Sequence, residues 1–189
     1  MKRLPAAILT LLLLAAPATA DVVRTVSTEY YTVQGTTPAA IAADLQINAP
    51  WDKGLGKHTA VTRTKINIQY KMERRGRNCS ARDVKVYLHL TYLYPRLARS
   101  VDGETRQWWK EFLTKLEEHE LIHGEISTRA AHALSDKLET LTNMDCINFK
   151  AIAKNRFNRL MTKLRQDQAT YDKLTDHGIR QERNRGRFP

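Results

Sequence analysis

The stretch of the sequence with the clearest chemical meaning is EEHELIHGE at residues 117–125, which contains the pattern His-Glu-x-x-His. Its two histidines, His119 and His123, are four residues apart, so on a helix they lie one above the other on the same face. Each imidazole can give a zinc ion one ring nitrogen at about 2.1 Å. Glu120 is turned about 100° from His119 around the helix, which places it beside the ion rather than on it. There it can take a proton from zinc-bound water, so the pattern predicts the site of a metallopeptidase.

The helix that would carry this pattern is long and has an inward face. Apolar residues recur at helical spacing through residues 104–141, and Phe112 and Ile126 share the face of the two histidines. Two imidazoles without partners would be costly on a buried face, and a bound metal ion would compensate them. The alternative is a chance match of five letters on the polar side of an ordinary helix, and the inward face argues against it.

A catalytic zinc site needs a third protein ligand, with the fourth place left for water. His177 lies in an irregular segment after the second predicted helix, where the chain can fold back over the first, and Gly178 beside it gives the backbone freedom. On spacing alone, a solvated histidine and a ligand are equally consistent with His177. Four other residues fall on the wrong face of an element or in an exposed turn: His58, His89, His132 and Glu139.

The first half of the chain has the pattern of strands. Polar and apolar residues alternate with period two over residues 60–72 and 84–94, which is typical of strands with one wet face. Residues 21–33 are rich in Val, Thr and Tyr and predict another strand. Gly76 lies where the turn of a long hairpin is expected.

Helices are predicted for most of the second half. A short helix should follow Thr37-Pro38, and two long ones should cover residues 104–141 and 146–171. An irregular tail is expected over residues 172–189. Strands first and helices second predict the α+β class, with an antiparallel sheet of about three to four strands packed on two long C-terminal helices.

The first twenty residues have the pattern of an export signal. A basic start at residues 1–3 precedes an apolar stretch over residues 4–16, and Ala18-Thr19-Ala20 provides the small residues of a cleavage site. The apolar stretch is shorter than the about 20 residues that span a membrane. We therefore expect a cleaved signal peptide over residues 1–20, a single domain over residues 21–189, no membrane span, and a periplasmic or secreted location.

The two cysteines bear on the compartment of the protein, and the net charge bears on its partners. Cys79 and Cys146 are the two cysteines of the chain, and in an exported protein they most simply form one disulfide. The formal net charge of +11 would allow contact with anionic polymers of the cell envelope. The densest basic run, at residues 179–187, has no interleaved aromatic residues, so nucleic acid is not an expected partner.

Taken together, these residues resemble a family of predicted bacterial secreted zinc-dependent proteases, long catalogued as a domain of unknown function. The resemblance rests on YYTVQG at residues 30–35, WWKEFLTKLEEHELIH at residues 108–123 and YDKLTDHGIRQ at residues 171–181. It implies a zincin-like fold in which His119 and His123 look like zinc ligands, Glu120 like the catalytic base and His177 like the third ligand. The chain departs from the family after Gln181, where charged residues replace the small ones expected.

The leading prediction is therefore an exported zinc metallopeptidase in which Glu120 acts as the general base and then passes the proton to the leaving amine. Tyr171 could hydrogen-bond the developing oxyanion, or it could be a purely structural residue. A non-catalytic, zinc-stabilised protein that binds envelope polymers is an alternative, although such a protein would have no need of Glu120. An amidase acting on peptidoglycan peptides would use the same chemistry, and the sequence does not separate it from a peptidase.

Overall fold

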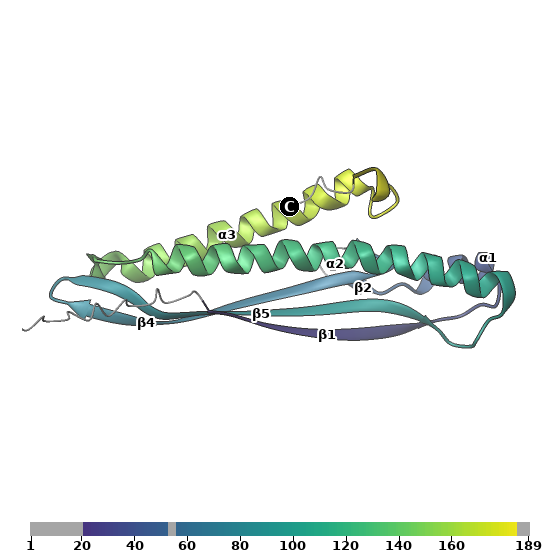
Figure 1. The fold of residues 1–189 in the computed structure, drawn as a ribbon, viewed down its shortest axis with the longest axis horizontal. Helices are drawn as coiled ribbons and strands as arrows, with labels where there is room; N and C mark the ends of the chain where they lie inside the picture. Colours follow the sequence, from purple (N-terminus) through teal and green to yellow (C-terminus); the bar gives the residue numbers. More distant parts are fainter. Residues whose placement is uncertain (1–20, 53–55, 185–189) are drawn as a thin grey trace, which may run out of the picture.

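The computed structural model describes residues 21–52 and 56–184, which form an elongated α+β arrangement (Figure 1). A long sheet makes one layer, α2 lies along one face of it, and α3 packs on α2. The expected signal peptide lies outside the described residues. The elements in chain order are β1 (Asp21–Val33), α1 (Pro38–Asn48), β2 (Trp51–Asp52), β3 (Gly56–Lys57), β4 (Val61–Arg75), β5 (Asn78–Leu97), α2 (Gly103–Glu139), β6 (Met144–Asp145), α3 (Cys146–Thr175) and the 3₁₀ helix η1 (Glu182–Asn184).

The main sheet has the order β1-β5-β4, and β6 adds a short pairing to the start of β5. β4 and β5 form the predicted hairpin, whose tight turn contains Gly76 at a φ of +61°. β4 and β6 are antiparallel to β5, as expected, but β1 runs parallel to it, with Val22 opposite Val86. The sheet is therefore mixed, because β5 lies between β1 and β4, which run in opposite directions.

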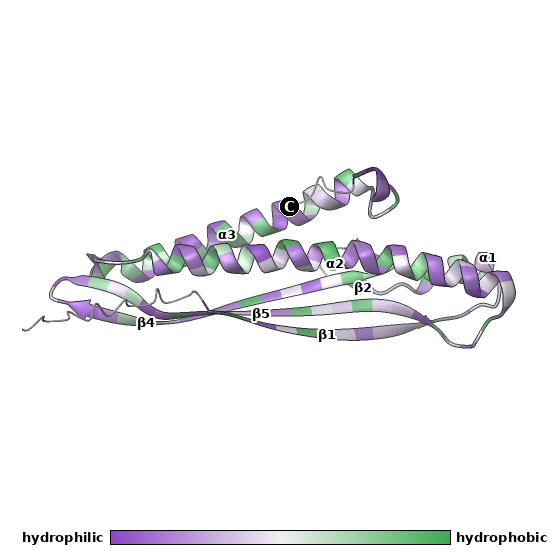
Figure 2. Cartoon of the chain, in the orientation of Figure 1, coloured by the Kyte–Doolittle hydropathy of each residue, from purple (hydrophilic) through white to green (hydrophobic). Residues whose placement is uncertain are grey.

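The helices confirm the sequence-based prediction of the α+β class. The Thr37 hydroxyl caps α1 by accepting a hydrogen bond from the backbone N–H of Ala40, and the side chain of Asp145 caps α3 through the N–H of Ile147. α2 has 37 residues and α3 has 30. Figure 2 shows hydrophilic and hydrophobic residues alternating along both helices, the pattern of amphipathic helices.

The main core fills the space between the sheet and the two long helices. It is formed by alternate residues of β5, which face α2, together with apolar residues of α2 and α3. Its fully buried members include Val86, Leu88, Leu134, Leu138 and Phe149. A second, smaller cluster joins α1 to the beginning of α2 and contains Val33, Ile41, Leu45 and Trp109. These two clusters hold α2 firmly against the sheet.

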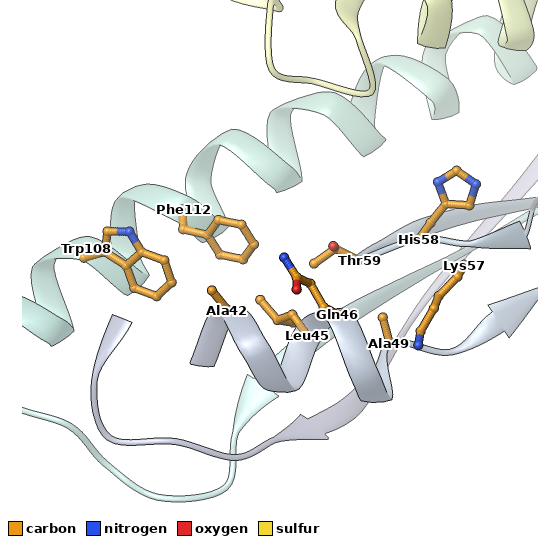
Figure 3. A pocket seen from close by; sticks show the side chains of 9 residues that line it. All are labelled: Ala42, Leu45, Gln46, Ala49, Lys57, His58, Thr59, Trp108 and Phe112. Atoms are coloured by element: carbon orange, nitrogen blue, oxygen red, sulfur yellow. The ribbon is translucent and has the colours of Figure 1, made fainter. Parts of the chain in front are cut away.

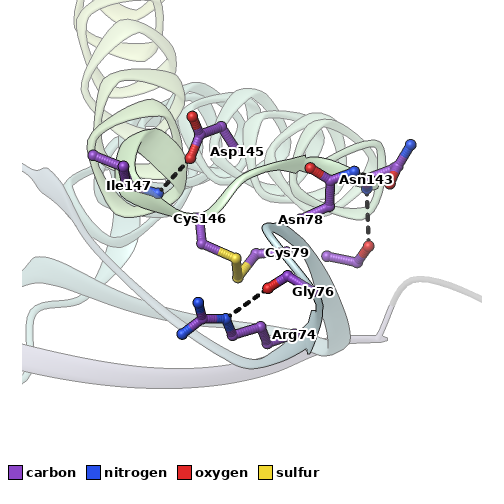
Figure 4. The surroundings of a disulfide bond; sticks show 9 residues. Arg74, Gly76, Asn78, Cys79, Asn143, Asp145, Cys146 and Ile147 are labelled. Carbon is purple, nitrogen blue, oxygen red and sulfur yellow. Dashed lines mark hydrogen bonds between the residues drawn. A yellow bond between two sulfur atoms is a disulfide. The ribbon is translucent and has the colours of Figure 1, made fainter.

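The disulfide expected between Cys79 and Cys146 is present and ties the first residue of α3 to the start of β5 (Figure 4). The same junction is held by the backbone N–H of Cys146, which donates to the Arg77 carbonyl at 3.1 Å. The disulfide is compatible with an exported protein. In the described part of the chain, no helix combines the length and the apolar character that crossing a membrane requires.

Candidate metal centre

His119 and His123 lie in the middle of α2 and are buried, with 4% and 8% of their surfaces exposed. Their Nε2 atoms are 3.2 Å apart, and the two rings meet edge to face. Two nitrogens that are each about 2.1 Å from a tetrahedrally coordinated zinc ion lie about 3.4 Å from each other. The spacing of the two histidines on an inward helical face therefore suits a shared ion.

α3 adds a carboxylate at the same point. Asp172 Oδ1 lies 2.9 Å from His123 Nε2 and 3.2 Å from His119 Nε2. His119, His123 and Asp172 each offer one ligand atom, and these three atoms all lie within 4.8 Å of one another. The Asp172 side chain keeps 24% of its surface exposed, so the cluster is open to solvent on that side. This group could hold a metal ion.

The outer nitrogens of both imidazoles face glutamine side chains. Gln181 Oε1 is 3.1 Å from His119 Nδ1, and Gln168 Oε1 forms a short hydrogen bond with His123 Nδ1. The Gln168 amide nitrogen donates to the His123 carbonyl at 3.0 Å and to Ser127 Oγ at 2.9 Å, which turns its oxygen toward the ring. In the neutral tautomers that these glutamine contacts favour, each Nδ1 donates and each Nε2 is left with a lone pair. A cation could then bind both Nε2 atoms and the Asp172 carboxylate, whereas without one a proton on an Nε2 atom would join them.

Tyr171 packs against both histidines of the cluster. Its ring stacks on His119 with centroids 4.7 Å apart and meets His123 edge to face at 4.8 Å. The side chain is completely buried, and its hydroxyl donates to Gln181 Oε1 at 3.0 Å. Burial, with the negative charge of Glu120, raises the pKa of the Tyr171 hydroxyl well above its usual value, so it remains a donor. This geometry favours the structural role considered for Tyr171 over contact with a substrate oxyanion.

Glu120 faces the sheet next to the two histidines and is 4% exposed. Thr62, near the start of β4, donates its hydroxyl to Glu120 Oε2 at 2.6 Å and also lies 3.0 Å from the Glu120 carbonyl oxygen. The carboxylate is thereby fixed in one orientation beside the cluster. About two turns further along α2 a second contact joins it to β4, since Ser127 Oγ lies 2.7 Å from Thr64 Oγ1.

The charges within the cluster are coupled. Burial raises the pKa of the Asp172 carboxyl, but hydrogen bonds from His119 and His123 and their charges outweigh burial and hold it well below its usual value. Burial lowers the pKa of His123, and the hydrogen bond to Asp172 more than compensates, so that the net pKa is raised. Asp172 therefore stays an anion, the form that binds metal ions.

His177, expected as the third ligand, lies beside the cluster without joining it. Its Nδ1 is 3.8 Å from Asp172 Oδ1, and 59% of its side chain is exposed. Asp176 and His177 both have positive φ values, +52° and +51°, and Gly178 follows at +94°. This turn lies against the cluster of His119, His123 and Asp172, because a Cβ on Gly178 would be 3.4 Å from the His119 ring. The assignment of His177 as a ligand stays a prediction.

Of the four remaining candidates, His58 differs from its prediction, since it is half-buried and not in an exposed turn. His89 and His132 are exposed, and His89 is hydrogen-bonded to the Thr25 hydroxyl on the outer face of the sheet. Glu139 is half-buried at the end of α2. His58 is half-buried, and its ring lies 5.4 Å from that of His177, centroid to centroid. The group that could hold a metal includes none of these four residues.

The sequence prediction did not identify Asp172, Gln168 or Gln181. A signal for the first two was present in α3. Leu164 and Thr175 are buried on the face that packs against α2, and Gln168 and Asp172 continue the same spacing of three and four residues. Polar residues at inward positions of an amphipathic helix indicate a buried polar site. Gln181 follows the helix in a turn, where periodicity gives no information.

Comparison with known proteins places these residues in a family. No curated protein and no solved structure is detectably similar to the chain. The family model described as "Bacterial protein of unknown function (DUF922)" matches residues 28–178, a span that includes β4, β5, both long helices and all three residues of the metal-binding group. The match covers most of the sequence, and the chain therefore belongs to the DUF922 family of bacterial proteins.

Proposed function

We propose that this protein is an exported zinc-dependent peptidase whose ion is held by His119, His123 and Asp172. The observation that carries the proposal is the convergence of two Nε2 atoms and one carboxylate oxygen, while both Nδ1 atoms contact glutamine oxygens. The disulfide supports an oxidising compartment, since such bonds persist mainly in exported proteins.

The donor set suits zinc better than other common ions. Two neutral imidazoles and one carboxylate are a usual protein ligand set of catalytic zinc, whereas magnesium and calcium prefer oxygen ligands alone. A bound zinc ion would polarise a substrate carbonyl and make water acidic enough to attack it near neutral pH. Three protein ligands leave a place for water, and a structural zinc site would use four. The set therefore favours hydrolysis over a purely stabilising ion.

Glu120 would move the proton in this reaction. Its carboxylate would accept a proton from the attacking water and deliver it to the departing amine. Thr62 donates to Glu120 Oε2 at 2.6 Å, which holds the carboxylate in place before and after the transfer. Gln168 and Gln181 would keep the imidazoles in the tautomer that presents Nε2 to the ion.

The proposal is tested by metal analysis and protein hydrolysis with the purified chain. The wild type should carry about one equivalent of zinc and cleave casein. Glu120→Gln keeps the size of the side chain and an oxygen for Thr62, so it should retain zinc while hydrolysis falls by roughly 10²- to 10⁴-fold. Glu117→Gln, on the same helix at an exposed position, is the matched control and should behave like the wild type.

Two results would contradict the proposal in different ways. A wild type that binds no stoichiometric zinc would remove the metal centre, and full hydrolysis by Glu120→Gln would remove the assigned base. Cleavage of peptidoglycan peptides without cleavage of casein would identify an amidase that uses the same residues.

A further inference from the structure

An apolar pocket of about 370 Å³ lies between α1 and the first turns of α2 (Figure 3). Ala42 and Leu45 of α1 form one side, and Trp108 and Phe112 of α2 form the other. The two aromatic rings are stacked, with centroids 5.6 Å apart and planes 9° from parallel. Leu45 belongs to the smaller core cluster, so this side of the pocket is part of the packed structure.

The remaining wall is formed by Lys57, His58 and Thr59, which precede β4. Two hydrogen bonds hold this wall in place. The Lys57 ammonium donates to the Ile47 carbonyl of α1 at 2.5 Å, and the Tyr31 hydroxyl donates to the Thr59 carbonyl at 2.8 Å. The pocket is therefore formed before any ligand enters it, which lowers the cost of binding.

The polar wall of the pocket lies near the candidate metal centre. The His58 ring lies 5.4 Å from that of His177, whose Nδ1 is 3.8 Å from Asp172 Oδ1. On the sheet side, Thr59 of the pocket is followed three residues later by Thr62, which holds Glu120. A molecule bound at the metal centre would extend along this wall to reach the apolar walls.

The spacing of residues along α2 gives the distance between the pocket and the candidate metal centre. Phe112 precedes His119 by seven residues, which corresponds to about 10 Å along a helix axis. An extended peptide advances about 3.3 Å per residue. A peptide held at the metal centre would therefore reach the pocket with the side chain of its second or third residue from the reacting bond.

We infer that this pocket binds one large apolar side chain of the peptide substrate, two or three residues from the bond that is cleaved. This inference rests on the proposed peptidase function and adds its specificity. The volume of about 370 Å³ is at the small end of the range of about 300–1,000 Å³ for ligand sites, and it has room for one large side chain. Stacked Trp108 and Phe112 favour an aromatic ring, which gains from ring–ring contact as well as burial.

Binding of peptides by the zinc-loaded Glu120→Gln variant tests the inference without relying on cleavage. The probes are blocked octapeptides of Ala, Ser and Gly with a single Phe moved along the sequence, and an all-small peptide as reference. Calorimetry should show roughly tenfold tighter binding when Phe occupies one or two particular positions. Equal affinity of all the peptides, or no binding of any, would overturn the inference.

Variants that fill the pocket complete the test. Ala42→Trp and Gln46→Trp place a large ring into the space from two lining positions, and each should abolish the preference for Phe. Ala43→Trp is the control, because Ala43 is exposed on α1 and does not line the pocket. A Phe preference that survives both filling variants would overturn the inference.

The two proposals fail separately. If the Phe-containing peptides bind selectively but the wild type cleaves no peptide, the pocket is a site for an apolar side chain and the proposed peptidase function is wrong. If the wild type cleaves peptides with no preference for an apolar residue on either side of the bond, the peptidase stands and the pocket assignment is wrong.

Discussion

At the level of single residues, the glutamines explain why two histidines and an aspartate can share one small space. Each amide oxygen can accept a hydrogen bond from an Nδ1 atom, which leaves both Nε2 atoms, next to Asp172, with lone pairs in the neutral tautomers. Without an ion, the three groups would have to be held together by a proton on an imidazole. In the proposed zinc site, the ion would take the place of that proton and interact with all three ligand atoms at once.

Asp172 should therefore matter more for metal binding than His177 does. Replacing Asp172 with Ala removes an oxygen within 3.2 Å of both Nε2 atoms, and we expect zinc affinity to fall by more than the about 10- to 100-fold typical of losing a supporting partner. His177→Ala should retain zinc, because its ring is largely exposed and its Nδ1 is 3.8 Å from Asp172. Zinc titration against a competing chelator measures both affinities.

The same titration separates the two candidates for the third ligand. Asp176→Ala is the control, since Asp176 lies in the same turn and pairs with Arg180 at the surface. If His177→Ala loses zinc as strongly as Asp172→Ala, then His177 is also a ligand, as the sequence prediction proposed. If Asp172→Ala keeps full affinity, the ligand set inferred from the geometry is wrong.

Gln168 should strengthen zinc binding without contacting the ion, through its hydrogen bond with His123. Gln168→Leu keeps much of the side-chain volume but removes the acceptor for His123 Nδ1 and the donor to Ser127 Oγ. We expect zinc affinity to fall by about 10- to 100-fold, while the fold persists. Gln166→Leu, two residues earlier at an exposed position, should leave zinc affinity unchanged. Equal affinities for the two variants would show that the Gln168 hydrogen bond does not support the ion.

The residues of α2 were predictable from the sequence, and those of α3 were missed for a physical reason. His119, Glu120 and His123 are local, and helical periodicity alone fixes their relative directions. Asp172 contributes through the packing of α3 on α2, a long-range contact that periodicity does not encode. The sequence predicted both helices, but α3 continues to Thr175, four residues past its predicted end, so Asp172 lies on the helix and not in the irregular tail. The choice between Asp172 and His177 also depends on how the turn at residues 176–178 is folded.

At the level of elements, Gly124 allows α2 to approach the sheet closely. It follows His123 directly, and a Cβ at this position would lie 2.0 Å from the Tyr92 hydroxyl oxygen of β5. Glycine normally weakens a helix interior by about 1 kcal/mol relative to alanine. Glycine is nevertheless needed here, because a larger residue would push α2 away from the sheet next to His119 and His123.

Gly124→Ala should accordingly destabilise the protein, although alanine is the better helix former. We expect a loss of about 1–3 kcal/mol in the free energy of unfolding, the usual cost of overpacking, measured by urea denaturation. Tyr92→Phe removes the oxygen that the new methyl group would meet, so the double variant should recover most of the loss. A double variant as unstable as Gly124→Ala alone would place the conflict elsewhere.

The pairing of strands shows a second limit of sequence reasoning. Alternation correctly assigned one face of β4 and β5 to the core, and Gly76 marked the hairpin between them. Periodicity describes the faces of a strand and says nothing about its neighbours or their direction. The parallel pairing of β1 with β5 arises from the route of the chain through α1, so it could not be read from residues 21–33.

For the molecule as a whole, the disulfide and the cluster of His119, His123 and Asp172 hold the two ends of α3. Cys146 begins the helix, and Asp172 lies one turn before its end at Thr175. Between them, Phe149, Ala153 and Leu164 are buried against the rest of the core. α3 is therefore held to the remainder of the fold covalently at its first residue and by the histidine cluster near its last.

Removing the disulfide should lower global stability without dismantling the metal centre. The cross-link joins residues 67 apart in sequence, and a closed loop of this length is worth about 4 kcal/mol in the chain-entropy description. The double variant Cys79→Ser/Cys146→Ser should unfold at correspondingly lower urea concentration. Its zinc content under native conditions should stay near that of the wild type, since the apolar core still positions α3. An unchanged urea midpoint would contradict this expectation.

The distance in sequence between the candidate ligands also determines when the metal-binding group can form during synthesis of the chain. Asp172 follows His123 by 49 residues, and Gln181 follows His119 by 62. When the two histidines of a growing chain have just been synthesised, the chain still lacks the Asp172 carboxylate and the Gln181 amide, whose oxygen contacts His119. The proposed ion could be held firmly only after α3 has been synthesised and has docked on α2. Under the proposed peptidase function, the chain would therefore gain its cleaving activity only at the end of folding.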